Sequence, residues 1–190
     1  ISRGVISTKQ VFDHVMTLDF KPYQIEKLLQ ELAWRDYWQQ IWIHKGNEID
    51  EDIRNPQNGM LTTEISTVLV DAKTDISAID KGINDLYQNG YMHNHLRMYT
   101  AAIDCNFGKN HWKLPAKWMY YHLLDADWAS NGLSWQWIAG TNSNKQYIVN
   151  QENINKYCKT EDTGTFLDIP YDILGGMEQP EILNPTQKRE

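Results

Sequence analysis

Residues 124–137 read LDADWASNGLSWQW, and this segment decides how the rest of the chain is interpreted. Two aspartates, one asparagine and three tryptophans lie within it. Packing of a helical-bundle core does not by itself require so many polar and aromatic side chains in one place. We therefore treat the segment as a candidate binding site. A helix C-terminus followed by an aromatic-packed turn is the alternative that these residues alone leave open.

The segment 31–38, ELAWRDYW, places four side chains of interest on one helix face. They stand at i, i+3, i+4 and i+7 and are Glu31, Trp34, Arg35 and Trp38. Bulky aromatic rings beside a carboxylate and a guanidinium can line a pocket for a flat, polar ligand. The alternative is an ordinary helix whose tryptophans belong to the core and whose charges pair at the surface.

The segment 90–98, GYMHNHLRM, contributes a third group of polar residues. Asn94 and Met98 are one helical turn apart, and Arg97 lies beside them. Asp125 is a plausible ion-pair partner for Arg97. An isolated histidine in such a setting is more often a satisfied polar residue than a ligand, so we predict no metal site.

Apolar residues recur at spacings of three and four along most of the chain, which predicts helices. A short helix is expected to be capped near Ser7. No region shows sustained period-two alternation, so the predicted fold class is all-α. The longer helices are expected over 22–43, 76–89, 92–106 and 115–125, the last with Pro115 in its first turn.

The segments between these helices are polar. Residues 46–75 are predicted to be mostly loop, with a short helix near 62–70. The Asn-rich stretch 141–165 is also predicted to be mostly loop. Residues 175–190 contain several Gly, Pro and Glu residues, and we expect an irregular C-terminal tail there.

Composition excludes several classes of protein. Of the 190 residues, 41% are hydrophobic and 23% are charged, which suits a packed domain. No apolar run approaches the roughly 18 residues that span a bilayer, so we expect no membrane segment. The two cysteines, Cys105 and Cys158, show no CxxC spacing, which favours neither zinc nor a disulfide framework. A reducing cytoplasmic compartment is the simplest expectation.

The charge is unevenly distributed. The net charge of −7 does not by itself favour nucleic acid. Residues 101–160, however, carry six Lys against four Asp and Glu, whereas the rest of the chain is acidic. Any surface that faces phosphates is therefore expected in this part of the chain.

Taken in order and spacing, the three segments resemble the FAD-binding helical domain of the DNA photolyase/cryptochrome family. Matching stretches also run from Ile1 to Gln10 and from Thr74 to Leu86, and Trp112 precedes Asp125 by thirteen residues. The resemblance covers roughly residues 1–170. It implies an all-helical bundle over 1–174, followed by the tail 175–190.

The resemblance implies FAD as the cofactor, bound in a bent form at the centre of the domain. Arg35 would lie near the flavin and its phosphates, and Arg97 and Asp125 would pair against the isoalloxazine ring. Asp127 would lie at the flavin edge, and Asn131 would face flavin N5. An amide suits that position because it carries both a donor and an acceptor.

The resemblance also implies a reaction and a partner. Excited, reduced FAD would give an electron to a cyclobutane pyrimidine dimer flipped out of damaged DNA, and would take it back after the ring splits. Trp135 and Trp112 match the first two members of the family's photoreduction chain. The residues on the substrate side would be Glu31, Trp34, Asn94, Met98 and Trp137.

Several family features are missing from this sequence. The first residue is Ile1 rather than Met, so we expect an upstream part that is missing from this sequence. Either the Ser/Thr-rich phosphate-binding segment of the family lies in that part, or the FAD diphosphate is held weakly. The α/β antenna domain of the family has no counterpart in these residues, so a second chromophore is not expected. A protein partner or another copy of the chain is an alternative source of that part. No Trp occurs between Trp42 and Trp112 to serve as the distal photoreduction Trp, and Asn150-Gln151 replaces an expected Asn-Pro.

Three functions are therefore compatible with the sequence. The first is a light-driven repair lyase for cyclobutane dimers. The second is a cryptochrome-like photoreceptor or a flavoprotein module that binds a protein partner, which the acidic balance favours. The third is a remnant that keeps the fold but holds no flavin.

Overall fold

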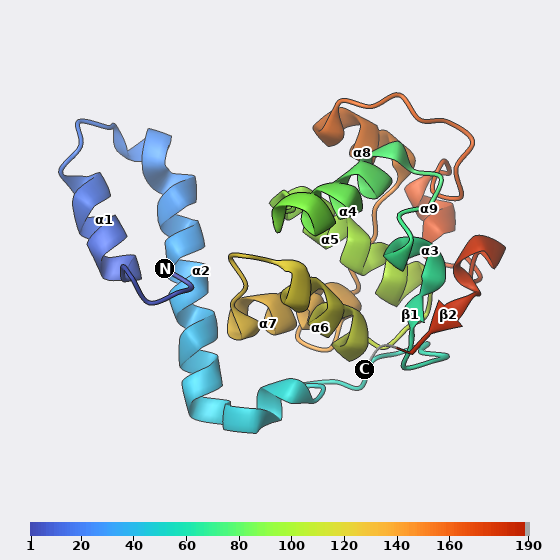
Figure 1. Ribbon diagram of the computed structural model, residues 1–190, viewed down its shortest axis with the longest axis horizontal. Coiled ribbons are helices and arrows are strands. Elements are labelled where there is room, and N and C mark those ends of the chain that lie inside the picture. The colour runs from blue at the N-terminus through green and yellow to red at the C-terminus, as the bar shows by residue number, and fades with distance from the viewer. Residues whose placement is uncertain (189–190) are drawn as a thin grey trace.

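The computed structural model describes residues 1–188 and is built mainly from helices (Figure 1). The predicted all-α class is confirmed. The α-helices are α1 (Thr8–Met16), α2 (Pro22–Lys45), α3 (Thr67–Val70), α4 (Ser77–Asn89), α5 (Asn94–Ala102), α6 (Lys113–His122), α7 (Trp128–Ala139), α8 (Gln151–Cys158) and α9 (Tyr171–Leu174). The 3-10 helices are η1 (Gly46–Asp50) and η3 (Glu181–Leu183), and η2 (Ile103–Phe107) is a π-helix.

Local chemistry explains the helices that the sequence predicted well. At the start of α1, the Ser7 hydroxyl accepts from the Gln10 backbone N–H while the Gln10 side chain accepts from Ser7, a reciprocal capping box. Helix α2 opens with Pro22 at a position where no backbone N–H is needed. Helix α4 ends at Gly90, whose φ of 65° is left-handed and suits glycine.

Three α-helices were not predicted: α7, α8 and the short α9. The segment 124–137 is not a helix end followed by a turn, because α7 begins within it and continues to Ala139. Asp127 caps this helix by accepting from the Ser130 backbone N–H at 2.9 Å. The segment 141–165 is mostly loop, as predicted, but it contains the unpredicted helix α8. Asn150 caps α8 by accepting from the Asn153 backbone N–H at 3.0 Å.

The C-terminal tail is more ordered than predicted. Strand β2 (Thr186–Gln187) pairs antiparallel with β1 (Ile65–Ser66), and Leu183 in η3 is buried. Residues 189–190 of the predicted tail lie outside the described residues. The predicted domain boundary after residue 174 stays a prediction.

The predicted helix over 92–106 also changes form part-way along. It is α-helical through Ala102 and then continues as the π-helix η2. The buried carboxyl of Asp104 on η2 accepts from the Ser66 backbone N–H at 3.0 Å and from the Asn110 amide at 2.8 Å. These hydrogen bonds tie η2 to strand β1 and to the loop before α6.

The core and the long helix α2 are arranged differently. One large core joins α3 to α8, whereas α1 and α2 form a helix pair along one side of the molecule (Figure 1). Helix α2 meets the rest of the chain mainly at α7. A small second core of Ile49, Ala129 and Leu133, with Trp38 against it, lies at that junction. The junction holds α2 opposite α5 and α7.

Candidate functional site

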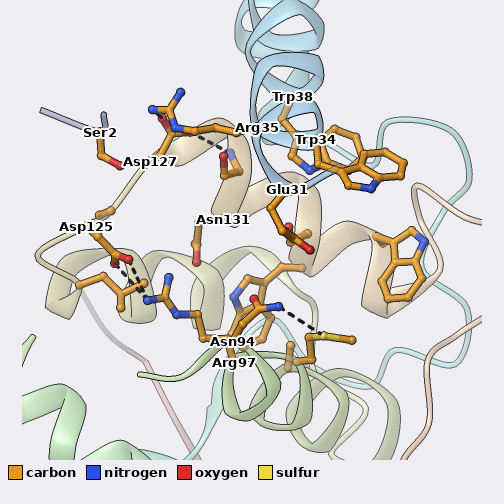
Figure 2. A pocket seen from close by; sticks show the side chains of 18 of the residues that line it. Ser2, Glu31, Trp34, Arg35, Trp38, Asn94, Arg97, Asp125, Asp127 and Asn131 are labelled. Carbon is orange, nitrogen blue, oxygen red and sulfur yellow. Dashed lines mark hydrogen bonds and ion pairs between the residues drawn. The ribbon is translucent and has the colours of Figure 1, made fainter. Parts of the chain in front are cut away.

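A cavity of about 530 Å³ lies between α2, α5 and α7 (Figure 2). Cavities of this size hold cofactors and other small molecules. All three segments singled out in the sequence reach it, although they are far apart along the chain. The predicted site residues that line it are Glu31, Trp34, Arg35, Asn94, Arg97, Met98, Asp125, Asp127, Asn131, Trp135 and Trp137.

Helix α2 supplies an open, aromatic wall. The four residues predicted to share one face of this helix all line the cavity. The rings of Trp34 and Trp38 are stacked, with centroids 5.4 Å apart and planes 27° apart. Trp34 is 53% exposed, and Glu31 is exposed as well. Both side chains are therefore accessible to a ligand (Figure 2).

An ion pair connects the α2 wall to the start of α7. The Arg35 guanidinium lies 2.7 Å from a carboxylate oxygen of Asp127, and both side chains are mostly buried. The Gln39 amide, one turn further along α2, donates to both Asp127 oxygens at 2.8 Å. The two predicted cofactor-binding residues thus bind each other, and Asp127 caps α7 at the same time.

A second ion pair lies at the other end of the cavity. Arg97 donates to both carboxylate oxygens of Asp125, at 3.1 and 3.0 Å, so the predicted pairing is confirmed. The Arg97 Nε–H also donates to the Met92 carbonyl at 2.7 Å, which fixes the plane of the guanidinium. Its position against a flavin ring stays a prediction.

Two neighbouring residues of α7 offer hydrogen-bonding groups to the cavity. The Asn131 amide nitrogen donates to the Ala116 carbonyl at 2.8 Å, and the side chain points into the cavity (Figure 2). The amide oxygen of Asn131 is therefore left for a ligand. Ser130 also lines the cavity, and its buried hydroxyl has no hydrogen-bond partner within residues 1–188. Burying such a hydroxyl is unfavourable unless a bound group satisfies it.

The residues assigned to the substrate side gather at one end of the cavity. Asn94 and Met98 lie one turn apart on α5, and the Asn94 amide nitrogen is 4.0 Å from the Met98 sulfur. Trp137 on α7 is 42% exposed. With Glu31 and Trp34, these side chains offer a carboxylate, an amide and apolar surfaces to one ligand.

The two tryptophans of the proposed photoreduction chain differ in position. Trp135 lines the cavity and is only 2% exposed. Trp112 is fully buried and is the one predicted site residue that does not line the cavity. Its indole N–H donates to Asp52 at 2.7 Å, as a buried indole requires. Transfer of an electron between these rings stays a prediction.

Sequence reasoning missed two contributors to the site. Gln39 holds Asp127, and its position four residues after Arg35 was the available signal. Ser130 gave no signal, because a serine early in a helix has many uses. Within residues 1–188, no cluster of three or more metal-ligating side chains is present, and no helix is both long and apolar enough to cross a membrane.

Comparison with known proteins identifies the family. A family model described as the FAD binding domain of DNA photolyase matches residues 28–189. A crystal structure of an archaeal photolyase from Sulfolobus tokodaii with two FAD molecules shares this fold. The structural match covers 96% of this chain and 44% of the archaeal chain, with a TM-score of 0.67 and 23% sequence identity.

Curated relatives include photo-lyases and a cryptochrome. The deoxyribodipyrimidine photo-lyase of Alkalihalophilus pseudofirmus is 26% identical over 88% of this chain and 36% of its own length. That of Buchnera aphidicola subsp. Baizongia pistaciae is 30% identical over 83% of this chain and 37% of its own. Cryptochrome DASH of Danio rerio is 26% identical over 74% of this chain and 28% of its own length. The chain thus spans about a third of these relatives' length.

The cavity suits FAD by the chemistry of its groups. The unsatisfied hydroxyl of Ser130 and the amide oxygen of Asn131 are available for hydrogen bonds with a polar ring edge. Arg35 and Arg97 bring two guanidinium groups to the cavity, each paired with an aspartate. Trp38 and Ile138 supply apolar surface. On the family match over most of its length, the chain belongs to the family of FAD-binding domains of DNA photolyase, and FAD is its cofactor.

Proposed function

We propose that this domain uses bound FAD and light to split cyclobutane pyrimidine dimers in DNA. One observation carries the proposal: the residues assigned to the cofactor and those assigned to the lesion line the same cavity. Asn131 and Arg97 lie on one side and Glu31 and Trp34 on the other. FAD as electron donor and the dimer as acceptor would therefore be in contact, with no side chain between them. When bound and reduced, FAD supplies the photoexcited electron that opens the dimer ring.

The side chains of the chain itself bind and orient the two molecules. Trp34 offers an exposed indole face on which a base can stack. The Glu31 carboxylate accepts hydrogen bonds from the N–H groups of a pyrimidine edge, and the Asn94 amide can donate to its carbonyl oxygens. These roles require the lesion to leave the duplex, as in other enzymes that act on an extruded base.

On the cofactor side, the amide oxygen of Asn131 accepts a hydrogen bond from the flavin edge. The Arg97–Asp125 pair presents a guanidinium whose charge is partly balanced, because Asp125 holds it at two points. Trp135 and Trp112 would return electrons to an oxidised flavin. Arg35 and Asp127 would act mainly by holding the two walls of the cavity together.

A cryptochrome-like photoreceptor, or another flavoprotein that repairs nothing, is the second candidate. The match to Cryptochrome DASH and the net charge of −7 favour it. This alternative predicts equal affinity for damaged and undamaged DNA, whereas a repair enzyme prefers the dimer. The free thiols of Cys105 and Cys158 support our proposal of a cytoplasmic location. A partner that supplies an N-terminal part stays a prediction.

The test of the repair proposal is substitution of Glu31 in the FAD-loaded protein. Hydrogen bonds to a charged group contribute about 1.5–3 kcal/mol, so Glu31→Ala should slow dimer splitting by about tenfold or more under blue light. Splitting is measured as the recovery of thymine absorbance in dimer-containing oligonucleotides. Flavin absorption should be retained, because Glu31 is exposed and has no role assigned on the cofactor side.

The matched control is Glu26→Ala, an acid on the same helix that does not line the cavity. Unchanged splitting in Glu31→Ala would remove this residue from the mechanism. Absence of splitting by the unmodified, FAD-loaded protein would instead favour the photoreceptor.

A further inference from the structure

A second cavity, of about 480 Å³, adjoins the first. Helix α2 contributes most of its lining, and the rest comes from the loop after η1 and the end of α7. Trp34, Trp38 and Trp137 line both cavities. Whatever occupies the second cavity is thus separated from an occupant of the first by little more than indole rings. The other lining residues are Gln30, Ala33, Tyr37, Arg54 and Asn142.

The aromatic rings at the second cavity form a connected cluster with open faces. Tyr37 lies edge-on to Trp34 at 5.7 Å and tilted against Trp38 at 5.0 Å. Tyr37 and Trp137 are each 42% exposed. Large aromatic rings grouped at the surface around a hollow are unusual unless they bind something. Their faces suit a planar ring that stacks.

Arg54 adds a cationic group that no protein acid uses. It follows an acidic stretch, yet its guanidinium has no ion pair or hydrogen bond within residues 1–188. The nearby acids are engaged elsewhere: Asp50 accepts from Trp128, Glu51 pairs with Lys113, and Asp52 accepts from Trp112. The guanidinium therefore remains available to an anion from outside the chain.

The backbone at Arg54 is also fixed in place. Its N–H donates to the Thr141 carbonyl at 3.1 Å, and the following N–H does the same. Thr141 directly follows the C-cap of α7, so these bonds anchor the loop at the cavity edge. Asn142 and Gln30 complete the lining with amides that can donate and accept.

We propose that the second cavity is a subsite for a nucleotide of single-stranded DNA, the neighbour of the base held in the first cavity. Tyr37 stacks on its base, Trp38 packs against the edge of that base, and Arg54 binds its phosphate. The inference rests on the proposed function, because that function places a base in the first cavity. Stacking rings beside one uncommitted guanidinium match a nucleotide, since every base has a π-face and every nucleotide one anion.

The subsite is tested by binding of short, undamaged oligothymidylate in the dark to the FAD-loaded protein. Each phosphate contact on a single strand contributes about 0.7 to the slope of log affinity against log salt concentration. Arg54→Gln should reduce the magnitude of that slope by about 0.7 and should weaken binding at low salt. Tyr37→Ala should weaken binding about fivefold or more at every salt concentration, because a stacking ring is lost.

Two substitutions serve as matched controls. Lys73→Gln removes a positive charge from an exposed residue between α3 and α4, outside both cavities, and Tyr121→Ala removes an 83% exposed ring from α6. Neither should change the slope or the affinity. If Arg54→Gln behaves like Lys73→Gln, or if the unmodified protein does not bind oligothymidylate, the subsite is overturned.

The two proposals fail separately. Oligothymidylate contains no dimer and the measurement uses no light, so a protein that splits no dimers can still show the Arg54 effect. Conversely, Glu31 can prove essential for splitting while Arg54→Gln leaves binding unchanged. The Arg54 backbone hydrogen bonds survive the substitution, and an unchanged thermal midpoint confirms that the variant folds.

Discussion

Helices α7 and α2 face the same cavity but are held in place differently. Seven of the 12 residues of α7 are buried, among them Trp135, whereas Ile25 is the one buried residue of the 24 in α2. Side chains of α7 must therefore satisfy the core and a ligand together. Glu31 and Trp34 of α2 line the cavity but are exposed, so they can be substituted to test function with little effect on folding.

The largest expected difference between the walls is in unfolding free energy. Trp135→Ala should lower it by about 3–5 kcal/mol, because a buried indole is replaced by a cavity. Trp34→Ala removes an indole that is 53% exposed and should change it by no more than about 0.5 kcal/mol. Urea unfolding of both variants measures the difference. Similar losses in the two would mean that α2 is as much a part of the core as α7.

A smaller change in unfolding free energy should come from pH, through the buried carboxyl of Asp104 on η2, which follows α5. Burial raises the pKa of Asp104 from 3.8 to about 6, and hydrogen bonds from Ser66 and Asn110 oppose the shift only in part. The folded state therefore binds the proton more tightly than the unfolded state does. The stability that this proton contributes is present below pH 4 and is lost as pH rises to about 6.

The substitution Asp104→Asn should remove this dependence, because the amide resembles the protonated carboxyl. At pH 7 the variant should be more stable than the unmodified protein by about 2–3 kcal/mol, an order-of-magnitude figure from the pKa shift. Urea midpoints across this pH range provide the measurement, with the exposed Asp13→Asn as the control. A variant that keeps the wild-type slope would assign the pH dependence to another group.

The same contrast between the walls explains which parts of the fold were predictable. Helix α2 contacts the core on one side, so its apolar residues recur at spacings of three and four residues, which predicts a helix. Helix α7 is buried on most of its surface, and it contains Ser130, Asn131 and Gly132, which are weak helix formers. Its sequence therefore shows neither the period nor the composition of a helix, although tertiary burial holds it in one.

Most of the site residues were predicted from the family resemblance, and fewer from residue spacing. Periodicity alone placed Glu31, Trp34 and Arg35 on one face of α2, where the structure has them. Proximity of Arg97 and Asp125 depends on how α5 packs near α6 and α7, which single-residue patterns do not encode. The ion pair of Arg35 with Asp127 was not predicted, because it depends on how α2 packs against α7. The pairing of β1 with β2 was also missed, since two-residue strands leave no pattern.

The smallest of the three stability effects should arise where the two walls are joined. Asp127 accepts from Arg35 and Gln39 on α2 and from the Ser130 backbone N–H on α7. Asp127→Asn keeps an oxygen for the cap but removes the charge that Arg35 needs. Asp127→Ala removes the cap as well. We expect losses of about 1 kcal/mol for the first and about 2 kcal/mol for the second.

The consequence for FAD separates the two roles of Asp127. If Asp127 mainly joins the walls, both variants should weaken FAD binding, because α2 would no longer be held opposite α7. Adding Gln39→Ala to Asp127→Ala should then have no further effect, since both changes break the same joint. Fluorescence titration with FAD measures this. Additive losses from Gln39→Ala and Asp127→Ala would mean that each side chain contributes separately, and that the small core around Ile49 and Leu133 is what holds α2 in place.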